Sequence, residues 1–330
     1  GHEPVDPYID LENRESKNIY ALIEIMGGHQ DVILENLRLE GQESEQGRDF
    51  FEKVNVSYPT HIMPGMPGVG WGIGNLTIKN IDVISMESGP AVMRYNKSTI
   101  LIDDVRMKNL AYGMWVWNCT DSDIQIINND VSLNPDWSWH GIHFLRVNKG
   151  LVVRGNKVAG SRGTAINLAW TNEAIIEKNI IQDHHSFAWG YAVRIFNYST
   201  NNYVAENKFK NLDGEGGGIL IAGGAHSNTV EFNDFIFSQL PGWSDSSPNG
   251  PGAVLIDINS HSNKIFEVKF PYGRNISICN MIWDKSDDPV TPEYDGLNEI
   301  HHWLPCEKLP EREAHVFGED IKAEALMGDQ

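Results

Sequence analysis

Three residues that could carry proton-transfer chemistry occupy the same place in successive apolar segments. His143, Asn167 and Arg194 each come third, after a small residue and a branched aliphatic one. An imidazole can remove a proton, while an amide and a guanidinium can hold the negative charge that develops beside a carboxylate. His140 is a second candidate base, and Tyr191 is a candidate proton donor. These residue types indicate abstraction of a proton next to a carboxylate.

Large aromatic side chains accompany these positions along the chain. Aromatic rings stack on sugar rings, so a surface that combines them with fixed polar groups suits an elongated glycan. The candidate stacking residues are Trp115, Trp117, Trp139, Trp189 and Phe196. Exposed aromatics can equally pack against a loop or another subunit, and both interpretations stay open at this point.

The elements that must position these side chains recur with a period of about 25 residues. Short β-rich segments end in a polar turn with the frame apolar, x, x, Asn, x, apolar. The members of the frame are Asp103, Asn129, Asn156, Asn179, Asn207 and Asn233. Asparagine tolerates left-handed backbone geometry, and its amide can bond to its neighbours in a stack. Such strands without intervening helices predict a β-solenoid.

A second family of segments starts with a small residue and alternates with a period of two. The positions expected to face inward are Val92, Met114, Ile142, Ile166, Val193, Ile219 and Val254. The next residue in each segment then faces outward, which gives the stack Met93, Trp115, His143, Asn167, Arg194, Leu220 and Leu255. Neighbouring coils would place His143 and Asn167 about 5 Å apart, and His143 and Arg194 about 10 Å apart.

With these repeats the chain resembles the right-handed parallel β-helix superfamily, which includes pectate-lyase-like and NosD-like repeat proteins. The resemblance covers roughly Val32 to Phe270. It implies an all-β, single-stranded right-handed parallel β-helix of about nine to ten coils with a C-terminal tail. We expect a β-helix domain over 1–280 with an insertion at 41–71, followed by a C-terminal cap or tail over 281–330 with a short polar helix at 307–327.

Fold alone does not choose an activity, because this scaffold hosts lyases, hydrolases, epimerases and binding proteins. We expect a carbohydrate-active enzyme that cleaves or rearranges glycosidic linkages. Lyase or epimerase chemistry is slightly favoured, since His143, Asn167 and Arg194 share one sheet.

The main alternative is a glycoside hydrolase or an intramolecular transglycosylase similar to inulin fructotransferases. It would use the loop carboxylates Asp183, Asp213 and Glu215, which could also be ordinary turn-capping residues. A non-catalytic glycan-binding or surface protein is the third hypothesis.

The composition and net charge of the chain limit the classes of molecule that it can bind. The chain has 330 residues, a net charge of −19 and 41% apolar residues. These values fit a folded protein, and no apolar stretch is long enough for a membrane span. A strongly acidic chain is a poor partner for nucleic acid, and it repels polyanionic sugars unless the site itself is locally basic. The expected partner is a polysaccharide or oligosaccharide, and exposed aromatics would also allow a homotrimer.

The sequence contains few motifs that indicate a cofactor, a metal ion or a cellular location. The spacing of Cys119, Cys279 and Cys306 matches no metal motif. We expect no cofactor and no metal ion, because no cluster of outward-facing aspartates supports Ca²⁺. A signal peptide is not visible at the N-terminus. The resemblance nevertheless implies a secreted, periplasmic or cell-surface protein.

Overall fold

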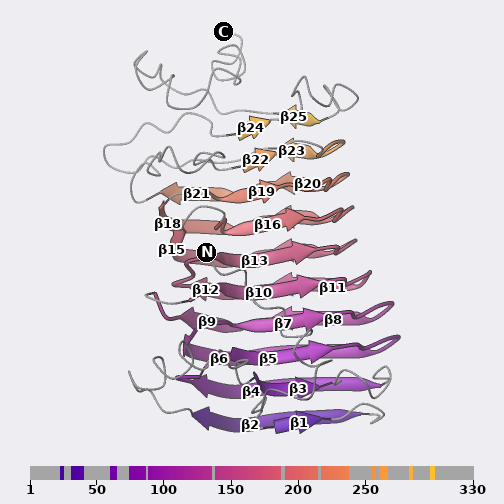
Figure 1. The fold of residues 1–330 in the computed structure, drawn as a ribbon, viewed down its shortest axis with the longest axis vertical. Helices are drawn as coiled ribbons and strands as arrows, with labels where there is room; N and C mark the ends of the chain where they lie inside the picture. Colours follow the sequence, from indigo (N-terminus) through magenta and orange to yellow (C-terminus); the bar gives the residue numbers. More distant parts are fainter. Residues whose placement is uncertain are drawn as a thin grey trace, which may run out of the picture.

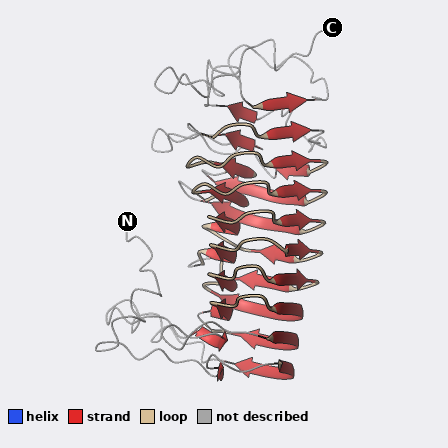
Figure 2. Cartoon of the chain, turned by 90° about the vertical axis from the view of Figure 1, so that its right-hand side faces the viewer, coloured by secondary structure: helices blue, strands red, loops and turns tan. Residues whose placement is uncertain are grey.

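The fold is a stack of short parallel strands in three faces around one apolar core (Figures 1 and 2). A computed structural model describes residues 23–25, 31–40, 60–64, 74–86, 88–135, 138–186, 190–214, 217–237, 254–256, 260–266, 282–284 and 298–301. All regular elements in these ranges are β-strands. The parallel β-solenoid expected from the repeats is therefore confirmed.

Face 1 is a ten-stranded parallel sheet, with one strand from each successive coil. Its strands are β1 (Ile23–Ile25), β3 (Thr60–Pro64), β5 (Ser88–Met93), β7 (Met114–Trp117), β10 (His140–Leu145), β13 (Thr164–Ala169), β16 (Val193–Phe196), β19 (Ile219–Ile221), β22 (Val254–Ile256) and β24 (Ile282–Asp284). The stack thus includes a strand from the segment 41–71 and another from the segment 281–330.

Faces 2 and 3 belong to one fifteen-stranded sheet that bends around the core. The long strands β2 (Val32–Glu40), β4 (Asn75–Ile84) and β6 (Thr99–Leu110) contribute to both faces. Face 2 continues with β8 (Asp123–Ile127), β11 (Leu151–Arg154), β14 (Ile175–Glu177), β17 (Tyr203–Ala205), β20 (Thr229–Glu231), β23 (Lys264–Phe266) and β25 (Glu299–His301). Face 3 continues with β9 (Asp130–Leu133), β12 (Lys157–Ala159), β15 (Ile180–Ser186), β18 (Lys208–Gly214) and β21 (Asp234–Phe237). The expected helix at 307–327 lies outside the described residues.

The inward positions of face 1 fill the core as the alternation predicts. Val92, Met114, Ile142, Ile166, Val193, Ile219 and Val254 are all completely buried in one continuous apolar cluster. The outward register differs from the prediction in one coil. Ala91 lies opposite Trp115, and Met93 lies opposite Trp117. The expected stack of Met93 on Trp115 is wrong, because β5 is offset by two residues from the frame that the sequence indicated.

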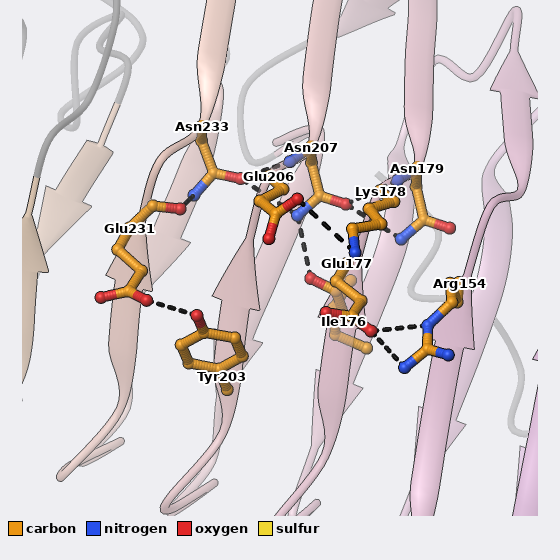
Figure 3. Close-up of polar contacts among 10 residues, drawn as sticks. All are labelled: Arg154, Ile176, Glu177, Lys178, Asn179, Tyr203, Glu206, Asn207, Glu231 and Asn233. Atoms are coloured by element: carbon orange, nitrogen blue, oxygen red, sulfur yellow. Dashed lines mark hydrogen bonds and ion pairs between the residues drawn. The ribbon is translucent and has the colours of Figure 1, made fainter.

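A ladder of buried asparagine amides joins the coils at the corner between faces 2 and 3 (Figure 3). From Asn129 to Asn207, each Nδ2 donates to the Oδ1 of the asparagine in the next coil, over 2.8 to 3.0 Å. Every rung also donates to a backbone carbonyl of the preceding coil. Each accepting Oδ1 takes a second hydrogen bond from a backbone N–H. The rungs are Asn129, Asn156, Asn179, Asn207 and Asn233. Because these amide groups are paired, they can be buried at little cost.

The left-handed residue of each turn is the one before the ladder asparagine. Asn128, Gly155, Lys178, Glu206 and Phe232 have φ between 53° and 68°. The expectation that the ladder asparagine itself adopts this geometry is therefore wrong, since its amide is committed to the neighbouring coils.

The first member of the repeat frame is Val105 and not Asp103, the residue expected from the sequence. The backbone N–H of Val105 donates to Oδ1 of Asn129 over 2.9 Å, so Val105 holds the ladder position in its coil. Asp103 lies opposite Ile127 instead, two residues earlier on the same strand.

Removing one rung should destabilise the solenoid markedly. In Asn179→Ala, the N–H and Nδ2 of Asn156 and the carbonyl of Val153 lose their buried partner. We expect at least about 3 kcal/mol less free energy of unfolding in urea, since each unpaired buried group costs about 1–3 kcal/mol. The matched control is Asn172→Ala, whose stacked amide is partly exposed to water. The control should lose less than about 1 kcal/mol. Equal losses in the two variants would contradict the role of the buried ladder.

Candidate functional site

The residues predicted to share an outward column do lie side by side on face 1. His143 of β10 lies opposite Trp115 of β7 and Asn167 of β13. Asn167 in turn lies opposite Arg194 of β16. Leu220 and Leu255 continue the same column. The predicted order of this column is therefore confirmed from Trp115 to Leu255.

Side-chain contacts link four members of the column into one cluster. The ring of Trp115 stacks on that of His143 with centroids 4.4 Å apart and planes inclined by 17°. Nδ2 of Asn167 lies 3.3 Å from both ring nitrogens of His143. Nε of Arg194 donates to Oδ1 of Asn167 over 2.8 Å. The asparagine amide thus bridges the imidazole and the guanidinium and fixes their separation.

A local break in the strand alternation brings a second imidazole to the same side. A Cβ added to Gly141 would lie 2.4 Å from the carbonyl oxygen of Ala165 and 2.6 Å from a methyl group of Val158, so this glycine faces the interior. Ile142 also faces the core. With two successive inward positions, His140 and His143 both project outward, and their ring centroids lie 5.2 Å apart. Only glycine fits the crowded corner that makes this arrangement.

Burial keeps both imidazoles neutral. Burial, and then the positive charge of Arg194, lowers the pKa of His140 to about 3. Burial, His140 and Arg194 in that order hold the pKa of His143 well below its ordinary value of 6.5. The backbone N–H of Thr164 donates to Nδ1 of His140 over 3.3 Å. At neutral pH both rings therefore offer lone pairs rather than positive charge.

Arg194 is a cation without an acidic partner in the described part of the chain. Its guanidinium bonds to Asn167 and lies over the ring of Phe196, with Cζ 4.1 Å from the centroid. Among the described residues, no carboxylate lies within ion-pair distance of it. Burial lowers the pKa of Arg194 from 12.5 to about 10, so it stays protonated at neutral pH. A desolvated guanidinium of this kind favours an anionic ligand.

Not every predicted face residue is accessible. Trp115, Trp139, His143, Arg194 and Phe196 are partly exposed, whereas His140, Asn167 and Trp117 are buried. Tyr191 is completely buried in an apolar cluster with Leu220, Ala222 and Leu255. The expectation that Trp117, His140, Asn167 and Tyr191 belong to an exposed surface is therefore wrong, because all four are buried.

The expectation that the candidate carboxylates lie on loops is wrong for Asp183 and Asp213, which belong to β15 and β18. Asp183 has a φ of 52°, and its two oxygens accept hydrogen bonds from the amides of Gln182 and Asn211 over 2.8 and 2.9 Å. It therefore marks a local bend within β15, with both oxygens engaged. The backbone of Asp213 pairs with that of His185, while the side chain of Asp213 lies outside the described residues. Glu215 and Trp189 also lie outside them.

Face 2 carries a row of charged pairs that sequence analysis missed (Figure 3). Arg154 pairs with Glu177, Lys178 pairs with Glu206 over 3.6 Å, and the hydroxyl of Tyr203 donates to Glu231. Burial and then the hydrogen bond to Glu231 raise the pKa of Tyr203 to about 12. These contacts join adjacent coils, so the row stabilises the stack modestly.

A metal centre has no support in the part of the chain that the structure describes. Within the described ranges, no group of three or more histidine, cysteine, aspartate or glutamate side chains is placed to hold a metal ion. His184 is buried, with Nδ1 2.6 Å from the hydroxyl of Ser161, whereas the next residue, His185, is exposed. The two histidines project to opposite sides, as adjacent strand residues should. No helix among the described residues is long and apolar enough to cross a membrane.

Solved structures with a related architecture are distant in sequence. A periplasmic alginate epimerase, AlgG, aligns over 85% of this chain and 70% of its own, with 14% identity and a TM-score of 0.49. The Streptococcus pneumoniae surface protein and adhesin PfbA aligns over 74% and 81%, with 10% identity and a TM-score of 0.42. The Dettilon tailspike protein aligns over 84% and 62%, with 15% identity and a TM-score of 0.35. Likeness at this level carries no argument about activity.

Sequence comparison gives a clearer result for the family than for individual relatives. Curated protein sequences provide no significant match. The family model described as the right-handed β-helix region matches residues 69–235, which is half of the chain. The matched range contains the asparagine ladder and the whole cluster from Trp115 to Arg194. The chain therefore belongs to the right-handed β-helix family.

Proposed function

We propose that this protein binds an acidic glycan on the outer side of face 1 and removes the proton next to a sugar carboxylate. The observation that carries the proposal is Arg194, a partly buried guanidinium that bonds to Asn167 and faces no carboxylate among the described residues. A uronate carboxylate would supply the missing countercharge. The stacked rings of Trp115 and His143 beside it offer a flat surface against which a sugar ring can lie.

The chemical step follows from the charges of the cluster. Neutral His143 takes the proton from the carbon that bears the carboxylate, and the electron pair moves into the carboxylate as an enolate. Arg194, together with the amide of Asn167, stabilises that negative charge. In a lyase the electron pair then forms a carbon–carbon double bond and expels the glycosidic oxygen, which takes up a proton. In an epimerase the carbon takes a solvent proton on the opposite side.

Binding of an acidic substrate would also raise the pKa of His143 and so make it a stronger base. The depressed pKa of His143 makes it a weak proton acceptor in the free protein, and Arg194 contributes to that depression. A bound carboxylate cancels the charge of Arg194, so the pKa of His143 rises toward its ordinary value. The base then gains strength when the acidic sugar is in place, which suits a proton abstraction at neutral pH.

The other two hypotheses receive less support from the geometry. A hydrolase would need two free carboxyl groups across the scissile bond, but both oxygens of Asp183 are engaged in hydrogen bonds. A purely glycan-binding protein would have no need of an imidazole held neutral beside the bound carboxylate. Product analysis separates the three hypotheses.

The first test is product analysis by NMR in D₂O with oligomers of galacturonate, of glucuronate and of mannuronate with guluronate. We expect unsaturated sugar ends from a lyase, or deuterium at the carbon next to the carboxylate from an epimerase. His143→Gln should abolish either product, while the control His185→Gln, at an exposed position on β15 of face 3, should leave it unchanged. New reducing ends without unsaturation, retained in His143→Gln, would overturn the proposal in favour of hydrolysis.

Binding tests the role of Arg194 without relying on turnover. Arg194→Gln should weaken binding of an acidic oligosaccharide at least about tenfold in calorimetry, because a charge-assisted contact is lost in a desolvated site. A neutral oligosaccharide of the same length serves as the comparison ligand. Equal affinity of wild type and Arg194→Gln for the acidic oligomer would contradict the proposed carboxylate site.

The pKa of His143 provides an independent readout. In the wild-type protein, NMR titration of its ring should give a midpoint well below 6.5. Because the positive charge of Arg194 disfavours the imidazolium, both Arg194→Gln and saturation with an acidic oligosaccharide should raise this midpoint. A His143 midpoint insensitive to both changes would contradict the electrostatic coupling.

A further inference from the structure

Two aromatic side chains stand exposed at the corner between faces 1 and 2, where sequence analysis expected none. Trp170 directly follows β13, and Tyr198 follows β16 by two residues. Their exposed fractions are 40% and 68%. Both adopt left-handed backbone geometry, with φ of 47° and 59°. A bulky residue in this region of φ is unusual.

The corner does not need aromatic residues for folding. Asn118, Gly223 and Gly224 make the same turn in other coils with positive φ. Left-handed geometry costs a residue with a Cβ about 1–2 kcal/mol, which glycine avoids. Because the rings of Trp170 and Tyr198 are exposed, burial of apolar surface offsets little of this backbone strain. What distinguishes this corner from other exposed turns is that two exposed rings occur in adjacent coils beside the cluster on face 1.

Contacts connect this corner to the cluster on face 1. The ring of Trp170 lies 6.5 Å from that of Phe196, and the guanidinium of Arg194 lies over the Phe196 ring. The guanidinium of Arg146 lies 5.6 Å from the ring centroid of Trp170. A continuous row of two rings with a guanidinium at each end therefore runs from Arg194 to Arg146.

The backbone of the next coil leaves room for the second ring. A Cβ at Gly224 would lie 2.9 Å from Cε1 of Tyr198. The glycine thus lets the tyrosine ring lie flat against the main chain, with its other side open to solvent. Ala169 lies opposite Phe196, so Trp170 and Tyr198 belong to neighbouring coils and are offset by one residue along the chain.

We propose that the corner formed by Arg146, Trp170 and Tyr198 is a second subsite for the same acidic glycan. This inference rests on the proposed function and names its substrate as a chain of several acidic sugars. One sugar carboxylate pairs with Arg194. A sugar further along the chain stacks on Trp170 or Tyr198, and its carboxylate pairs with Arg146.

Charge complementarity favours an acidic chain over a neutral one. The protein carries a net charge of −19, yet this edge of face 1 presents the guanidinium groups of Arg146 and Arg194 beside the exposed aromatic rings. A local row of guanidinium groups gives a polyanion a path on a protein whose overall field would repel it.

The test compares short and long acidic oligosaccharides in calorimetry. The probes are dimers and hexamers of galacturonate, glucuronate and alternating mannuronate and guluronate. For the sugar that binds, wild type should bind the hexamer at least about tenfold more tightly than the dimer. Trp170→Ala, Tyr198→Ala and Arg146→Gln should each weaken hexamer binding about three- to tenfold and leave dimer binding unchanged. The matched control is Phe232→Ala, an exposed aromatic with a φ of 53° at a different corner.

The outcomes separate this inference from the proposed function. If the hexamer binds, Arg194→Gln removes binding and the three corner variants bind it as wild type does, the proposed function stands and the second subsite is overturned. If none of the acidic hexamers binds to wild type, the proposed function fails and the subsite fails with it. Weakening of hexamer binding by Phe232→Ala to the same extent as by Trp170→Ala would also overturn the subsite, since the effect would then not be local.

Discussion

The structure depends on buried amide side chains that bond from one coil to the next. At the corner between faces 2 and 3, the ladder asparagines from Asn156 to Asn233 each accept two hydrogen bonds through one oxygen. All five rungs donate two through the nitrogen. A second ladder, formed by Asn202, Asn228, Asn263 and Asn298, does the same between faces 1 and 2. These bonds satisfy backbone groups that the sharp corners leave without strand partners. They also fix the register, because a shift of one residue would leave every amide unpaired.

The candidate site exists because that register is fixed. Trp115, His143, Asn167 and Arg194 come from four different coils, and each contact among them requires one alignment of neighbouring strands. Gly141 adds His140 to the same side through a break in alternation that only a missing side chain permits. The site is thus a property of the stack, and it places an imidazole beside a guanidinium although the two repel each other when both are charged. The rigid sheet holds the two groups close together despite this repulsion.

Much of this could be predicted from residues alone, and the failures have physical causes. Alternation identified the core positions and the outward column, because strand geometry leaves two sides only. It misplaced Met93, since a two-residue offset in β5 preserves the alternation and changes only the neighbour. Asparagine was correctly expected in the turns, but left-handed geometry belongs to the preceding residue, as at Lys178 and Glu206. Strand alternation does not predict which outward side chains are exposed: Tyr191 and Trp117 are buried. Trp170 and Tyr198 could have been noticed as aromatic residues at turn positions that hold asparagine, glycine or arginine in other coils.

The corner turns have a consequence for how such a chain can diverge. Their geometry is imposed by the ladder amide and the backbone, while the left-handed residue beside it varies from Asn128 to Gly155, Lys178, Glu206 and Phe232. Its side chain makes little difference to the bend and points away from the core. Each corner is therefore a column of positions that mutation can explore with a modest and nearly constant cost. New recognition properties can accumulate there coil by coil, while the interior of the solenoid remains unchanged.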